Sequence, residues 1–73
     1  MRFIRGVNGA ILIVYGRTGG IRVPTRHLPN GRMVTAHTGR PVRGNWWETE
    51  IREALGIGPC DSIQAALEPY FAA

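Results

Sequence analysis

The sequence predicts an α+β fold in which a four-stranded antiparallel sheet, built from two β-hairpins, precedes two short C-terminal helices, in the order ββββαα. Three observations predict this order. Eight of the ten glycines fall within residues 1–45, where they separate short runs rich in β-branched and aromatic residues. Two of the segments between these runs, Asn8-Gly9 and Pro29-Asn30-Gly31, have the composition of hairpin turns. After residue 45, apolar residues recur at helical spacing.

The first hairpin is expected at Asn8-Gly9, between strands at 3–7 and 10–15, because Asn and Gly both tolerate the positive φ of a two-residue type I′ turn. This turn pairs Val7 with Ala10, Arg5 with Leu12 and Phe3 with Val14. One face then carries Ile4, Ile11, Ile13 and Tyr15. The other face is also mostly apolar, so the hairpin needs cover on both sides. A homodimer through this hairpin is one way to supply that cover.

The second hairpin is expected at Pro29-Asn30-Gly31, between strands at 21–28 and 32–38. A type I turn closed by a left-handed glycine pairs Leu28 with Arg32, Arg26 with Val34 and Pro24 with Ala36. Pro24 inside a strand indicates an edge or a bulge, because proline cannot donate to a ladder. Even positions then carry the arginines of one face, namely Arg22, Arg26, Arg32 and Arg40.

Two helices are expected in the second part of the chain. The first follows Asn45, whose side chain should cap it together with Glu48, and ends at Gly56. Asp61, with Gln64, should cap the second helix, and Pro69 should end or kink it. The apolar stripes expected to pack on the sheet are Trp47, Ile51, Ala54 and Leu55, and then Ile63, Ala66, Leu67 and Tyr70.

Length and composition predict one small domain. Seventy-three residues, 44% hydrophobic and 19% charged, make an ordinary globular mixture and not a disordered chain. Residues 1–44 form a basic hairpin module, and residues 45–73 form a helical segment packed on it. The longest apolar run, Ala10 to Tyr15, is too short to span a bilayer, which takes about 20 residues. We therefore expect a cytoplasmic protein without a membrane partner.

The charges are strongly segregated. All nine basic residues are arginine, and eight of them lie in residues 1–45, which contain no acid, whereas all five acids follow. Arginine offers a fork of donors suited to phosphates, so this half predicts binding to an anionic surface, either nucleic acid or a nucleoprotein complex. The expected contacts are Arg22, Arg26, Arg32, Arg40 and Arg43. A solvated arginine-rich face without a partner is the plain alternative.

Two observations narrow the mode of binding. The aromatic residues are not interleaved with the arginines, which disfavours a reader that stacks bases on its sheet. The two helices resemble a helix-turn-helix in spacing, but the second carries Asp61 and Glu68, and an anionic helix would be repelled by DNA. Trp46, adjacent to a core tryptophan, is a candidate anchor for a partner, together with Arg5.

Other functional classes stay open. An acidic protein surface is another partner that the arginines could bind. An alternative function is a protein-binding inhibitor or adaptor that blocks a host protein through Trp46, the arginine face or the acidic helices; anti-CRISPR proteins of mobile elements are comparable in size and character only. We expect no enzyme, although His27 and His37 on one sheet face would suit a metal-free ribonuclease. No cofactor motif or cysteine metal cluster is present, since Cys60 is the single cysteine.

Overall fold

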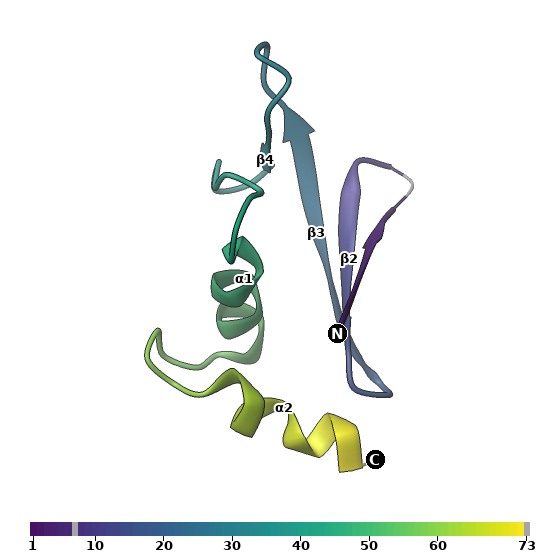
Figure 1. Cartoon of the computed structure of the whole chain (residues 1–73), viewed down its shortest axis with the longest axis vertical. Helices are drawn as coiled ribbons and strands as arrows, with labels where there is room; N and C mark the ends of the chain where they lie inside the picture. Colours follow the sequence, from purple (N-terminus) through teal and green to yellow (C-terminus); the bar gives the residue numbers. More distant parts are fainter. Residues whose placement is uncertain (7, 73) are drawn as a thin grey trace.

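The computed structural model describes residues 1–6 and 8–72 and has the predicted α+β architecture (Figure 1). An antiparallel sheet with the strand order β1-β2-β3-β4 is followed by two helices. The elements are β1 (Arg2–Arg5), β2 (Ala10–Tyr15), β3 (Gly19–His27), β4 (Met33–Thr35), α1 (Trp46–Leu55) and α2 (Ile63–Ala72). Within the described residues, no helix is long and apolar enough to cross a membrane.

The second hairpin has the predicted turn and register. The Leu28 amide donates to the Arg32 carbonyl at 2.7 Å, and the Gly31 amide donates back to the Leu28 carbonyl at 2.9 Å. Gly31 has φ +85°, a conformation that favours glycine. Arg26 lies opposite Val34, as expected from a three-residue loop. The pairing is confirmed, although β4 is only three residues long.

The prediction that the Pro24 strand is an edge or is bulged is wrong. β3 lies between β2 and β4, and its register with β2 is continuous through the pair Ala10–Pro24. Pro24 is tolerated because β4 ends at Thr35, so only Ala36 faces it on that side. The Ala36 amide donates to the Pro24 carbonyl at 2.8 Å, and no ladder donor is required of the proline there.

The predicted register of the first hairpin is wrong by one residue. Arg5 lies opposite Ile11 instead of Leu12, and Phe3 lies opposite Ile13 instead of Val14. The Gly6 amide donates to the Ala10 carbonyl at 2.7 Å, so three residues, not two, separate this pair. The expected Val7–Ala10 pair involves Val7, which lies outside the described residues.

The turn residues of this hairpin were predicted with the right conformation, since Asn8 and Gly9 have φ +72° and +65°. The shift nevertheless changes the faces, because side chains alternate along a strand. Ile4 now lies opposite Leu12 and shares its face, instead of the face of Ile11 and Ile13. The same alternation of side chains identifies the residues on the face of the sheet that is turned away from the helices, here called the open face. The open face carries Arg2, Ile4, Leu12, Val14, Arg22, Pro24 and Arg26.

The core lies on the other side of the sheet, between the sheet and the helices. Ile13 of β2 and Ile51 of α1 are both fully buried there. The buried members of this core are Ile11, Ile13, Tyr15, Val23, Ile51 and Leu67. Both predicted helical stripes contribute to this core, through Trp47, Ile51 and Leu55 and through Ile63, Leu67 and Tyr70, whereas Ala54 is exposed.

Tyr15 and Tyr70 join the sheet to α2. Their rings meet edge to face with centroids 5.1 Å apart. Burial, and secondarily the neighbouring Tyr70, raise the pKa of the Tyr15 phenol above its ordinary value.

The helix ends differ in detail from the prediction. Asn45 precedes α1, but its side chain makes no capping hydrogen bond, so the predicted capping box with Glu48 is wrong. The backbone forms the turn instead, with the Glu48 amide donating to the Asn45 carbonyl at 3.1 Å. Gly56 ends α1 as predicted, with φ +69°.

The cap of α2 is Ser62, not Asp61. The Ser62 Oγ accepts a hydrogen bond from the Ala65 amide at 3.2 Å. Asp61 is used one turn earlier, where its Oδ2 accepts from the Gly58 amide at 2.7 Å. Pro69 does not end α2, which continues to Ala72.

Candidate anion-binding surface

The nine arginines fall into two groups by their partners. Within residues 1–6 and 8–72, Arg40 and Arg52 form ion pairs with side-chain carboxylates, and the other seven form none. All five acids lie on or beside the helices. The basic half of the sequence therefore folds into a surface whose guanidinium groups are not neutralised within the molecule.

Arg40 departs from the predicted role, because its guanidinium binds α1. Its Nη1 donates to Oε1 of Glu50, and its Nη2 donates to Oε1 of Glu53 at 3.1 Å. Glu50 is only 5% exposed, so its carboxylate depends on this partner. The Arg40 amide also donates to the Thr35 Oγ1 at 2.9 Å. Arg40 thus joins the loop after β4 to α1, and it is not part of the unpaired arginine surface.

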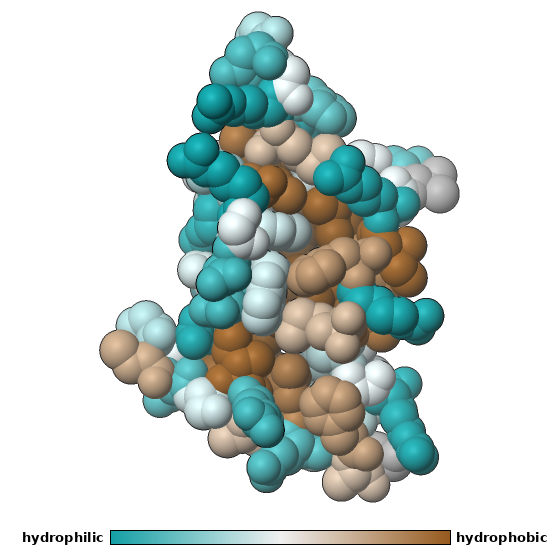
Figure 2. All heavy atoms as spheres, viewed as in Figure 1, coloured by the Kyte–Doolittle hydropathy of each residue, from teal (hydrophilic) through white to brown (hydrophobic). Residues whose placement is uncertain are grey.

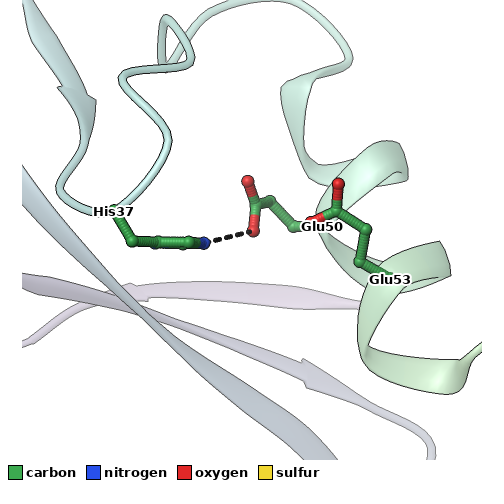
Figure 3. Close-up of side chains that lie close together, drawn as sticks. All are labelled: His37, Glu50 and Glu53. Atoms are coloured by element: carbon green, nitrogen blue, oxygen red, sulfur yellow. Dashed lines mark ion pairs between the residues drawn. The ribbon is translucent and has the colours of Figure 1, made fainter.

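His37 lies beside the same carboxylate (Figure 3). Its Nε2 is 4.0 Å from Oε2 of Glu50, and one ligand atom each of His37, Glu50 and Glu53 lies within 4.8 Å of the others. A cation at this position would compete with Arg40, which already binds both carboxylates. The cluster therefore acts as an ion-pair network between the loop and α1.

The two histidines considered for ribonuclease chemistry border different hollows. His27, at the end of β3, borders a hollow of about 160 Å³ with Arg5 and Met33. His37 borders one of about 430 Å³ with Glu50 and Glu53.

Arg22 and Arg26 are exposed on the open face of β3. Val23 between them is buried in the core, and side chains alternate along a strand, so the two arginines point away from the helices. Because β4 pairs only with residues 25–27 of β3, Arg22 lies at a free edge of the strand, and from that edge it also borders the hollow that contains Glu50 and Glu53. These two predicted site residues share the open face, and neither of them lines the groove of Arg32 and Arg43.

Arg32 and Arg43 border a shared groove beside β4, here called the hairpin groove. Its volume is about 420 Å³, and its lining residues are Leu28, Asn30, Arg32, Met33, Val34, Pro41, Val42 and Arg43. The segment 41–43 is held along β4 by a bridge between Pro41 and Val34 and by a 3.0 Å hydrogen bond from the Val42 amide to the Met33 carbonyl. This attachment brings an arginine from the loop next to one from the hairpin.

Arg43 also borders a second hollow of about 220 Å³, together with Arg5, Phe3 and Trp46. The Trp46 amide donates to the Arg43 carbonyl at 3.3 Å, so one turn of chain sets the tryptophan beside the arginine. The predicted partner residues Arg5 and Trp46 are therefore neighbours of a predicted anion-binding residue. The sequence carried one signal for this, the three-residue spacing of Arg43 and Trp46, but the contact with β1 has no signal in the sequence.

The two hollows are adjacent, because Val42 and Arg43 line both of them. Figure 2 shows that the face viewed has an apolar band between hydrophilic side chains along its two sides. Neither hollow has a carboxylate in its lining. We call the two hollows together the arginine track, defined by Arg5, Arg32, Arg43 and Trp46.

Comparison with known proteins gives no relative: no protein-family model, curated protein or solved structure matches the chain.

Proposed function

We propose that this protein binds nucleic acid without catalysis, with the arginine track holding the phosphate backbone. The observation that carries the proposal is the position of Arg43, which borders one hollow with Arg32 and the adjoining hollow with Arg5 and Trp46. Unpaired guanidinium groups along a groove suit successive phosphates, because each offers several donors in a fixed geometry.

The track favours a single strand over a duplex. Trp46 and Phe3 border the hollow of Arg5 and Arg43, so an aromatic surface accompanies the cations. Aromatic rings beside a basic groove are typical of single-strand binding, where bases stack on the rings and phosphates follow the charges. The apolar floor of the hairpin groove, formed in part by Leu28, Met33 and Val42, suits unpaired bases and offers little to a duplex backbone.

The test is fluorescence anisotropy with labelled single-stranded DNA and RNA of one sequence, and with the corresponding duplex, over a series of salt concentrations. We expect tighter binding of the single strands and an affinity that falls steeply with salt. Arg43→Ala should weaken binding about tenfold, as for a lost hydrogen bond to a charged group. It should also lower the salt slope by about 0.7, the value for one phosphate contact on a single strand.

Arg17→Ala is the matched control, because Arg17 is exposed between β2 and β3 and its removal changes the net charge equally. We expect it to change the affinity much less than Arg43→Ala. Equal losses for both variants would show attraction by net charge alone, and no binding at low salt would refute the proposal.

A further inference from the structure

The outer edge of β1 is an unpaired strand edge with two exposed apolar side chains. β1 is the first strand of the sheet, and all four of its residues are exposed, Phe3 at 50% and Ile4 at 42%. The opposite edge, β4, is partly covered by the segment at Pro41 and Val42. Proteins usually shorten, bend or cover such edges, because their free amides and carbonyls pair readily with other strands.

The hydrogen-bond phase of β1 tells which groups are free. The Gly6 amide donates to Ala10 of β2, and hydrogen-bonded pairs alternate along an antiparallel ladder. The backbone amides and carbonyls of Arg2 and Ile4 therefore bond to β2, and those of Phe3 and Arg5 point outward. Among the described residues, no hydrogen bond engages these outward groups. An added strand would thus bond to Phe3 and Arg5.

From these features we propose that β1 binds an extended, acidic segment of a partner protein by strand addition. Arg2 and Arg5 flank Phe3 and Ile4, and neither arginine has a carboxylate partner within the described chain. A segment with two apolar residues between two acids would place carboxylates opposite the arginines and apolar side chains opposite Phe3 and Ile4. Cross-strand pairs of these kinds stabilise antiparallel sheets.

A second copy of the chain fits the same edge less well. Two-fold pairing of β1 with itself is antiparallel, and its hydrogen-bond phase requires that Phe3 and Arg5 face outward groups of the other copy. Every such register sets Arg2 or Arg5 opposite, or diagonally beside, its own counterpart. The diagonal neighbours lie about 7–8 Å apart, within the Debye length of about 10 Å at 0.1 M salt. Self-pairing therefore brings like charges together where an acidic segment brings opposite ones.

The test uses the acetylated and amidated hexapeptide Thr-Glu-Val-Val-Glu-Thr and the same peptide with Lys in place of Glu. Amide hydrogen exchange is followed by NMR on the full chain. We expect the acidic peptide to protect the amides of Phe3 and Arg5, while Ile4, already bonded to β2, changes little. The lysine peptide should bind at least about tenfold more weakly, a difference of 1.4 kcal/mol.

Two variants separate the backbone from the charges. Phe3→Pro removes an outward donor and leaves the bonds to β2 intact, so it should abolish peptide binding, while Phe3→Ala, which keeps the amide, should retain part of it. The double variant Arg2→Glu/Arg5→Glu should reverse the preference and bind the lysine peptide.

Three outcomes would overturn the proposal. They are protection of Phe3 and Arg5 in the free protein that grows with its concentration, protection of these amides by single-stranded DNA, and absence of protection by either peptide. The first would assign the edge to a second copy. The second would show that nucleic acid occupies the outward backbone amides of β1 as well as the side chains of the arginine track.

Discussion

At the scale of single residues, the carboxylate of Glu50 is a buried charge, and it therefore needs a charged partner. It is 5% exposed and depends on the guanidinium of Arg40, with His37 at 4.0 Å as a weaker neighbour. We predict that Arg40→Ala lowers the free energy of unfolding by roughly 3 kcal/mol, because it leaves a buried charge without its partner. Urea unfolding measures this loss.

The double variant Arg40→Ala/Glu50→Gln is the control. It removes the buried charge together with its partner, so it should be more stable than Arg40→Ala alone. If Glu50→Gln gives no rescue, the loss in Arg40→Ala arises elsewhere, for instance from the bond between Arg40 and Glu53. Neither variant removes a member of the arginine track, so binding of a single strand by the folded protein should be preserved.

The sequence predicts which half of the chain carries the unpaired arginines, but it does not predict which individual arginine pairs with a carboxylate. The unpaired state of Arg32 and Arg43 follows from a basic half without acids, and that half is visible in the sequence. The pairing of Arg40 does not follow, because it requires Glu50 to face the loop after β4, a result of how α1 packs. The prediction that aromatics avoid the arginines was likewise a statement about sequence neighbours, and packing brings Phe3 and Trp46 beside Arg43.

At the scale of elements, the turn between β2 and β3 carries the contact between the sheet and α2. Gly16 has φ +62°, and a Cβ there would lie 2.7 Å from both the Cβ and the carbonyl oxygen of Tyr70. The Arg17 amide donates to the same carbonyl at 3.1 Å. The end of α2 is therefore fixed by backbone contacts, and a side chain at Gly16 would push it away.

We predict that Gly16→Ala costs about 2 kcal/mol more stability than Gly39→Ala, because both strain a positive φ but only the first inserts a methyl group against a neighbour. Gly39 has φ +71°, and a Cβ there would meet nothing within 4 Å. Thermal unfolding gives the two values. Equal losses would mean that the backbone conformation alone sets the cost and that α2 adapts freely.

The two hairpins show how far turn chemistry determines register. Pro29 disfavours a two-residue turn, because it cannot donate the closing hydrogen bond, and the loop length and the pairing predicted on this basis are confirmed. Asn8-Gly9 is compatible with a loop of either two or three residues, since both residues adopt positive φ in either case. The apolar pattern did not decide either, because β2 is apolar at every position. A single extra loop residue then moved Ile4 to the open face.

At the scale of the whole molecule, both helices lie on the same face of the sheet (Figure 1). The helices and the connection between them supply all five acids. The helices cover the face of Ile11, Ile13 and Val23, while the open face combines apolar side chains with Arg2, Arg22 and Arg26. The segregated charges of the sequence thus become a three-dimensional polarity. Glu50 and Glu53 of α1 pair with Arg40, and Glu48 pairs with Arg52, whereas the other seven arginines have no carboxylate partner within the described residues.

This one-sided cover predicts that neighbouring residues of β2 differ in their contribution to stability. Ile13 is fully buried against the helices, whereas Leu12 faces the open side and is partly exposed. Ile13→Ala should cost about 3 kcal/mol through lost burial and a residual cavity. Leu12→Ala should cost about 1 kcal/mol, because much of its surface is already in water.

Urea unfolding at two protein concentrations measures both substitutions and tests the state of the open face at the same time. For a monomer with an uncovered face, neither midpoint depends on concentration, and the difference between the two variants persists. Comparable losses at both positions, with a midpoint that rises with concentration in the parent protein and less in Leu12→Ala, would show that a second copy covers Leu12. The homodimer expected from an apolar first hairpin would then form face to face through the sheet, since pairing along β1 is opposed by its own arginines.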